Sequence, residues 1–316
     1  MRRVYSEHVP LAELVGHRAL DALADRSIQL LAAVRPGEEP IAAELVASAR
    51  ARGLSVGLWP MLDDADGRWL NPANERRFEA WVDALVAELP AIDSLVMDLE
   101  PPIAEVRALV DGRLEAARAW LGRDLSTARH AHIVRRLRER GIESYAAVIP
   151  AVLHAGRVGR GWQRGLGTPV DGVGYDRVSP MLYTSLLEGY GFGVVHRDTA
   201  RDLLRRWSAL AFARFGARAS VSLGAVGVGA LGDEQTLRDP AELAEDVAVV
   251  RAAGIDDLAL FDLSGALARP PIEPWLDALI GDGAGETPRV TRRGAAIDAG
   301  VRVTGLALDV VAIRAS

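Results

Sequence analysis

The chain has 316 residues, a net charge of −6 at neutral pH and a pI of about 5.6, an acidic balance that does not favour binding to nucleic acid. It contains no cysteine, which excludes disulfides, thiolate nucleophiles and cysteine-ligated metal sites. All 37 basic residues are arginine, so a lysine Schiff base, a lysine general base and a P-loop lysine are excluded as well.

Eight short apolar runs recur along the chain and are predicted to be β-strands. Most are continuous rather than alternating, which is typical of a parallel sheet covered on both faces. The runs are residues 3–8, 27–34, 54–61, 94–100, 144–149, 177–184, 219–225 and 257–263.

Helical patterns separate these runs, and several of the predicted helices end at a glycine, namely Gly53, Gly141, Gly216 and Gly254. The helices are predicted at residues 11–24, 41–52, 74–89, 196–215, 240–253 and 271–280. Eight strands alternating with helices indicate an α/β fold, a single (β/α)8 TIM barrel over residues 1–281. A doubly wound open sheet is the alternative, although no GxGxxG motif follows the first strand.

Three segments exceed a minimal barrel. Residues 103–140 form a helical insertion after strand 4, and residues 151–176 form an extended loop, rich in glycine and arginine, after strand 5. Both follow the strand ends where barrels build active sites, so they are candidates for a lid or a cleft wall. Residues 282–316 are predicted to be a linker and a C-terminal extension, either an added helix, short strands or a partner-binding tail.

The N-terminal residues and the length of the apolar stretches indicate the cellular compartment of the protein. Arg2 and Arg3 are not followed by the apolar segment of a signal peptide. The longest apolar stretches have the length of strands, so we expect no membrane span. These features predict a cytoplasmic protein.

The most informative segment is 92–102, an apolar run that ends in Asp98 and Glu100 before Pro101 and Pro102 stop the strand. Residues i and i+2 of a strand point to the same face, so both carboxyl groups should project together from the mouth of the barrel. Because burying carboxylates is costly unless they are used or paired, the pair indicates either an active site or acids that cap a helix or bind arginine.

Other predicted strands also end in acidic or aromatic side chains. Carboxylates suit acid–base catalysis, and aromatic rings suit stacking on sugars. We predict that these side chains line one pocket together with Asp98 and Glu100: Glu7, Trp59, Met181, Tyr183 and Asp262. For Glu7 and Asp262 a structural ion pair with Arg35 is the competing interpretation.

The fourth strand resembles the DxxDxDxE motif of family 18 glycoside hydrolases, the chitinases and related endo-N-acetylglucosaminidases. Asp93, Asp98 and Glu100 occupy the first, third and final positions, and Val96 replaces the second aspartate. The segment Pro180-Met-Leu-Tyr183 is similar to the Met-x-Tyr strand of the same family. The resemblance covers these two strands and the barrel fold.

The resemblance implies a glycosidase with a retaining, substrate-assisted mechanism. Glu100 would be the general acid, Asp98 would orient the 2-acetamido group of the substrate, and Tyr183 would hydrogen-bond its carbonyl. From their places at the strand ends, and apart from the resemblance, we expect Glu7, Trp59, Met181 and Asp262 to contact the substrate. The expected partner is a carbohydrate, with no metal and no cofactor.

Two other functions stay open. One is a non-catalytic carbohydrate-binding or scaffold barrel that has lost part of the charge relay at Val96. The other is a metal-assisted hydrolase or isomerase that uses Glu7, Asp98, Glu100 and Asp262.

Overall fold

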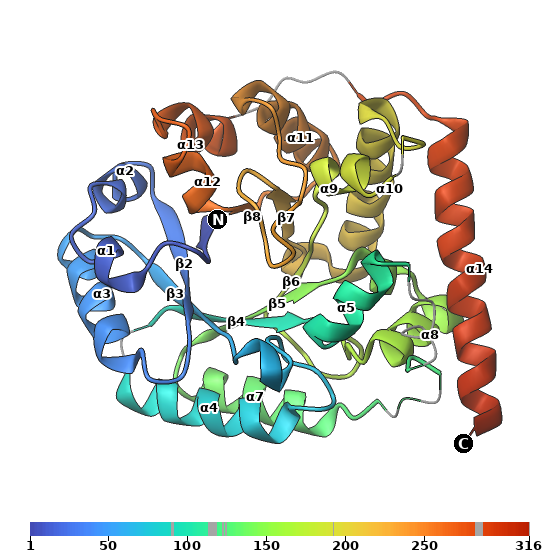
Figure 1. Ribbon diagram of the computed structural model, residues 1–316, viewed down its shortest axis with the longest axis horizontal. Helices are drawn as coiled ribbons and strands as arrows, with labels where there is room; N and C mark the ends of the chain where they lie inside the picture. Colours follow the sequence, from blue (N-terminus) through green and yellow to red (C-terminus); the bar gives the residue numbers. More distant parts are fainter. Residues whose placement is uncertain are drawn as a thin grey trace.

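The computed structural model describes residues 1–89, 92–112, 119–121, 123, 125–191, 193–281 and 287–315. In this part of the chain eight parallel strands pair in the order β6-β5-β4-β3-β2-β1-β8-β7, with helices around the outside (Figure 1). The strands are β1 (Arg2–Ser6), β2 (Ile28–Val34), β3 (Val56–Pro60), β4 (Ser94–Leu99), β5 (Glu143–Val148), β6 (Arg177–Pro180), β7 (Val221–Gly224) and β8 (Leu258–Phe261). Each overlaps its predicted run, so the (β/α)8 TIM barrel is confirmed.

The ring of strands closes between β6 and β7. The Ser220 N–H donates to the Val178 carbonyl and the Leu182 N–H donates to the Ser222 carbonyl, both at 2.9 Å. Isolated parallel bridges mark the same two points of contact. The alternative of an open doubly wound sheet is therefore wrong.

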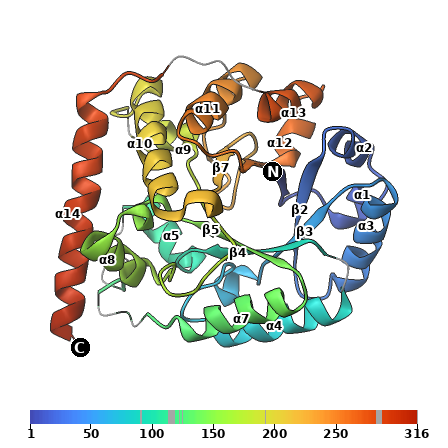
Figure 2. The ribbon, with the colours of Figure 1, turned by 180° about the vertical axis from the view of Figure 1, so that it is seen from behind.

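The helices cover the outer face of the barrel (Figures 1 and 2). They are α1 (Leu11–Leu14), α2 (Ala19–Ala24), α3 (Glu39–Ala51), α4 (Glu75–Glu88), α5 (Ile103–Val110), α7 (Ala128–Glu139), α8 (Gly156–Leu166), α9 (Thr184–Gly189), α10 (Arg197–Phe215), α11 (Pro240–Ala252), α12 (Leu263–Leu267), α13 (Glu273–Ile280) and α14 (Arg292–Ala315). The predicted insertion after strand 4 contains α5 and α7.

Two predicted segments differ in detail from the structure. The helix expected over residues 11–24 is divided into α1 and α2, because Gly16 interrupts it and the ring Nδ1 of His17 accepts a hydrogen bond from the Ala19 N–H (3.1 Å) where α2 begins. The extended loop after strand 5 contains α8, whose glycines allow a close helix contact.

The barrel interior is layered along its axis. At the N-terminal end Arg3 is almost fully buried. Its guanidinium donates to Gln29 (2.8 Å) and pairs with Glu143 (2.6 Å) and Asp257. Farther along, inward side chains such as Tyr145 form an aromatic and aliphatic layer. The N-terminal end of the barrel is thus filled by Arg3 and its ion pairs. The carboxyl groups at the end of β4 lie at the opposite, C-terminal end, the mouth of the barrel.

Helix α14 lies along the edge of the barrel beside α8 and α10 (Figures 1 and 2). The Trp162 indole donates to the Val301 carbonyl (2.9 Å), and the fully buried Asp309 carboxylate accepts from Arg157 (2.8 Å) and Arg160 (3.2 Å). The C-terminal extension is therefore a docked helix. Most of the predicted linker lies outside the described residues, and the division at residue 281 stays a prediction.

Among the described helices, none combines the length and the apolar character that a membrane span requires.

The close contact between α8 and α14 can be tested with Gly161→Ala. A Cβ at Gly161 would lie 1.9 Å from the Gly305 carbonyl oxygen, a backbone atom that cannot rotate away. We expect the free energy of unfolding, measured in urea, to fall by about 1–3 kcal/mol. The matched control is Gly300→Ala, because a Cβ at this exposed position in α14 would meet no atom within 4 Å. That variant should gain about 0.5–1 kcal/mol, and equal effects of the two substitutions would contradict the close contact.

Candidate active site

Strand β4 places two carboxyl groups at the mouth of the barrel. The Asp98 side chain points inward and is only 3% exposed. Glu100 is the first residue after β4 and is partly exposed, before Pro101 and Pro102 lead into α5. Asp93, the first acid of the segment, lies at the opposite end of the strand, where it accepts from the Val56 N–H (2.9 Å).

Both carboxyl groups hold their protons more tightly than usual. Burial raises the pKa of Glu100 to about 8, the nearby Glu7 carboxylate adds to this rise, and the Arg68 guanidinium opposes it. Burial also raises the pKa of Asp98 well above its ordinary value, with Glu100 and Glu7 as further causes. At neutral pH the site therefore carries at least one proton that it can donate.

Glu7 follows β1 and is the third acid of the mouth. Its carboxylate pairs with the buried Arg68, and the His8 ring nitrogen Nε2 lies 3.6 Å from it. The ion pair expected with Arg35 is wrong, because the Glu7 carboxylate pairs instead with Arg68, which lies in the loop after β3.

Arg68 was not predicted from the sequence. It lies in the loop between β3 and α4, in a left-handed backbone conformation with φ of 63°. The sequence shows only that Arg68 follows the third strand by a few residues. Because no local pattern indicates which way the side chain of a loop residue points, its contact with Glu7 could not be predicted. The guanidinium also pairs with Asp64 (2.7 Å) and lies over the Trp69 ring, 5.8 Å from its centroid.

Aromatic rings form the floor of the mouth. The Tyr183 ring stacks on Phe261, with centroids 5.6 Å apart and planes at 28°. Trp59 meets Tyr5 edge to face at 5.1 Å and Phe261 at 6.4 Å. Burial raises the pKa of Tyr183 well above its ordinary value, and the charges of Asp98 and Glu100 add to this rise. Phe261 and Tyr5 complete the aromatic cluster.

Met181 and Asp262 have other surroundings. Met181 is partly exposed at the end of β6, where its N–H donates to the Val148 carbonyl (2.9 Å). Asp262 is fully buried and caps α12, accepting from the Ser264 hydroxyl (2.7 Å) and the Gly265 N–H (3.2 Å). Its carboxyl group is thus occupied by protein donors, although Oδ2 also lies 3.5 Å from the Glu7 N–H. The pairing of Asp262 with Arg35 is wrong, because its carboxylate accepts from Ser264 and Gly265 instead.

Three buried polar atoms of the mouth have no hydrogen-bond partner among the described residues: Asp98 Oδ1, Trp59 Nε1 and Arg68 Nε. Trp59 is close enough to Asp98 to stabilise its charge weakly, but without the geometry of a hydrogen bond. Unsatisfied buried polar groups are rare in folded proteins. One free acceptor and two free donors are what a polar ligand with an amide group would satisfy.

Helix α5 narrows the mouth. Ile103 is buried against the aromatic cluster and Val106 packs on it. Arg107 then links two loops, pairing with Asp64 (2.9 Å) before α4 and donating to the Ala230 carbonyl (3.2 Å) after β7. Figure 1 shows α5 directly beyond the end of β4. The insertion after strand 4 therefore forms a wall of the site.

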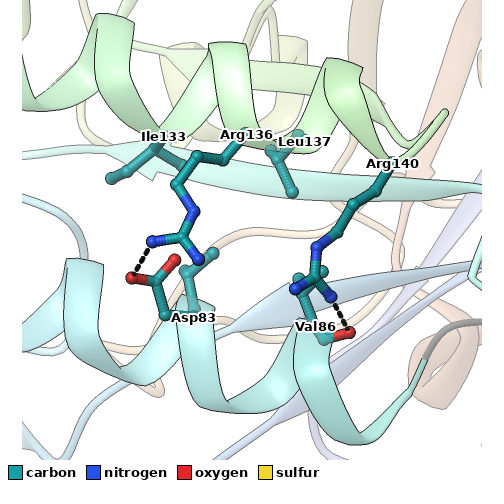
Figure 3. Close-up of a pocket in the computed structure, with 7 residues that line it drawn as sticks. Asp83, Val86, Ile133, Arg136, Leu137 and Arg140 are labelled. Atoms are coloured by element: carbon teal, nitrogen blue, oxygen red, sulfur yellow. Dashed lines mark hydrogen bonds and ion pairs between the residues drawn. The ribbon is translucent and has the colours of Figure 1, made fainter.

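Two hollows lie elsewhere on the molecule. One, of about 10 Å³, lies between α4 and α7 (Figure 3), where Arg136 pairs with Asp83 (2.7 Å) and Arg140 donates to the Val86 carbonyl (2.8 Å). The other, of about 230 Å³, is lined by residues that include Met1 at the N-terminal end of the barrel. Neither includes the acids of the mouth. Within the described residues no group of three or more His, Asp or Glu side chains is arranged to hold a metal ion.

The burial of Glu100 makes stability depend on pH. Its pKa in the folded protein is about 8, against an ordinary value of 4.5. The stabilising contribution of the protonated form is therefore complete below about pH 4.5 and is lost as the pH rises toward about 8. Because the substituted side chain in Glu100→Gln cannot ionise, the stability of this variant relative to the parent should increase as the pH is raised from about 5 to about 8.5. The increase is about 1.4 kcal/mol for each unit by which the pKa of Glu100 differs between the folded and the unfolded parent. Urea unfolding at the two pH values measures the gain, and a stability difference independent of pH would contradict it.

Comparison with known proteins supports the fold. No family model matches the sequence, and a search of curated proteins gives no significant match. The structure is similar to the PgaB (BpsB) glycoside hydrolase domain from Bordetella bronchiseptica, at 13% identity over 88% of this chain and 98% of that chain, with a TM-score of 0.52. The structure is also similar to a class V chitinase mutant from Cycas revoluta in complex with (GlcNAc)3, at 12% identity over 89% of this chain and 100% of that chain, with a TM-score of 0.50. A family 18 chitinase from Cycas revoluta in complex with allosamidin matches at 11% identity over the same shares of the two chains, also with a TM-score of 0.50. At identities this low the comparisons show the fold alone: the chain has the same (β/α)8 barrel fold as these glycoside hydrolases, and its resemblance to family 18 is confirmed at the level of the fold.

Proposed function

We propose that this protein is a glycoside hydrolase that cleaves a glycan containing a 2-acetamido sugar, with Glu100 as the general acid and Asp98 assisting. The observation that carries the proposal is the position of Glu100, partly exposed at the mouth of the barrel beside the buried Asp98. Its pKa, raised to about 8 by burial, leaves it protonated at neutral pH. A general acid for glycosidic bond cleavage needs such a carboxyl group.

The nucleophile is the second requirement. A conventional retaining glycosidase uses a second carboxylate, and β7 ends in Val-Ser-Leu-Gly without an acid. Attack by the acetamido oxygen of the substrate on its own anomeric carbon removes this requirement, and such substrate-assisted families are known exceptions to the two-carboxylate rule. Asp98, ionised once substrate is bound, would stabilise the positive charge of the cyclic intermediate.

The unpartnered atoms of the mouth suit an acetamido group. Asp98 Oδ1 is a buried acceptor for an amide N–H, and Trp59 Nε1 is a buried donor for a carbonyl. The Tyr183 hydroxyl is a second donor near the acids. The rings of Tyr183 and Phe261 offer a stacked apolar surface for a sugar. Glu7 and Asp262 would hold the shape and charge of the site more than contact the sugar.

A non-catalytic carbohydrate-binding barrel is the second candidate. It is favoured by Val96, an apolar residue two positions before Asp98 on the same face of β4, which leaves Asp98 without a charged partner from its own strand. In this case the mouth would bind sugars without cleaving them.

Hydrolysis of aryl β-glycosides tests the proposal. We expect cleavage of a substrate with a 2-acetamido group and little cleavage of its 2-hydroxyl analogue. Glu100→Gln should lower kcat by about 10²–10⁴-fold, because the amide keeps the shape but has no proton to transfer. Asp98→Asn should also lower kcat, because an amide does not stabilise the developing positive charge. In the parent enzyme the rate should fall as the pH rises through about 8, where Glu100 loses its proton.

Glu88→Gln, at an exposed position in α4, is the matched control and should keep the parental rate. Cleavage that does not require the acetamido group would contradict substrate assistance while leaving the glycosidase assignment intact. Sugar binding without turnover in the parent protein would favour the second candidate.

A further inference from the structure

The Glu7–Arg68 ion pair is buried beside the two acids of β4. Glu7 is 6% exposed and Arg68 is 8% exposed. Buried ion pairs contribute little net stability, because the cost of removing both charges from water offsets their attraction. Stability alone therefore does not account for this pair at the mouth of the barrel.

The loop between β3 and α4 is built to hold Arg68 in place. Gly67 and Arg68 are both left-handed, with φ of 93° and 63°, a conformation that is unfavourable for an arginine. The amides of Asn71 and Asn74 both donate to the Trp69 carbonyl, at 2.8 and 2.7 Å, and brace this turn. A strained backbone that is held so firmly indicates a functional constraint.

The same loop is attached to the backbone of the acid site. The Leu70 N–H donates to the Asp98 carbonyl at 3.0 Å, next to an isolated bridge between Leu70 and Leu99. Arg68 is therefore held in register with β4. Because Val96 is apolar, the charges that act on Asp98 and Glu100 come from other elements, and Glu7 and Arg68 are the pair that acts on both acids.

We propose that Glu7 and Arg68 are a positioning pair that sets the charge of the acid site. Glu7 offsets the positive charge that Arg68 brings to the site, so that Glu100 keeps the proton that its burial favours. The catalytic consequence rests on the proposed function of Glu100, whereas the control of its proton does not.

Other charged and titratable groups of the mouth also face this region. They are His8 after β1, Asp64 before α4, Asp98 on β4, Arg107 on α5, Tyr183 after β6 and Asp262 after β8. Asp64 and Arg107 pair with each other near solvent, and Asp262 is occupied in capping α12. Arg68 differs from them because it is buried and stays charged at every accessible pH.

The first half of the proposal predicts a specific effect of Glu7→Gln. Removing the negative charge leaves Arg68 uncompensated beside Glu100, so the pKa of Glu100 should fall by about one unit or more, a tenfold change in proton affinity. The pKa is measured by ¹³C NMR titration of protein labelled at the glutamate carboxyl carbons, and the Glu100 signal is identified by its loss in Glu100→Gln. An unchanged pKa in Glu7→Gln would overturn the proposal.

The second half is tested with Arg68→Met, which keeps the bulk of the side chain and removes its charge. Without Arg68 the positive charge that opposes the rise is gone, so the pKa of Glu100 should rise above its parental value of about 8. An unchanged or lowered pKa of Glu100 in Arg68→Met would contradict the role of Arg68. This test stands by itself if Glu7→Gln does not fold.

The double variant Glu7→Gln/Arg68→Met separates charge from structure. It removes one charge of each sign, so the pKa of Glu100 should return toward the parental value of about 8. A pair that only supports the fold predicts instead that the double variant is at least as perturbed as Glu7→Gln. Arg107→Gln, which removes an exposed arginine from the same rim, is the control and should leave the pKa unchanged.

The titration needs no substrate, so the two proposals can fail separately. Parental protein that cleaves no glycoside but shows the expected shifts would refute the proposed function and keep this inference. Glycoside cleavage with an unshifted Glu100 in Glu7→Gln would refute the inference and keep the function.

Discussion

The mouth of the barrel is governed by the cost of removing three carboxyl groups from water. Asp98 and Glu7 are buried, Glu100 is surrounded by protein although part of it reaches solvent, and the buried cation among them is Arg68. Carboxyl groups without enough positive charge retain protons instead of ionising. The raised pKa of Glu100 follows from this imbalance, and so does its capacity to act as an acid.

The two ends of the barrel show how the same residue types take different roles. At the N-terminal end Arg3 and Arg177 pair with Glu143 and Asp257, so that two guanidinium groups meet two carboxylates. Such a balanced network fills the interior and holds the strands in register. At the mouth the acids outnumber their partners, and buried donors and acceptors remain unpaired. Barrel enzymes place chemistry at the C-terminal end and stability at the other, and the charge balance here follows that division.

The strand periodicity explains how much could be predicted from the sequence. The rule that residues i and i+2 share a face placed Asp98 and Glu100 together, and the alternation of strands with helices predicted the barrel. Position at a strand end did not reveal what each acid bonds to. Asp262 resembled a site acid, yet the Asp-Leu-Ser-Gly sequence is a helix start in which the carboxylate caps α12.

Arg68 marks the limit of this reasoning. Arg35 ends a predicted strand and was the natural partner for Glu7, whereas Arg68 reaches the acid only because a left-handed turn directs it inward. The turn depends on asparagine bonds to the backbone and on the contact of Leu70 with β4, which are tertiary interactions without a short-range pattern. Loops carry much of the functional variation of a conserved scaffold, and here a loop supplies the buried arginine that pairs with Glu7.

Because the loop between β3 and α4 supplies part of the site, similarity of the barrel fold does not by itself establish the function. The function has to be inferred from the site. Relatives in structure share the barrel at 11–13% identity, and a barrel supports many reactions. The site of this chain combines Val96 two positions before Asp98, no acid on β7, and a buried glutamate–arginine pair at the mouth. Burial keeps Glu100 protonated, and Glu7 offsets the positive charge with which Arg68 opposes that effect.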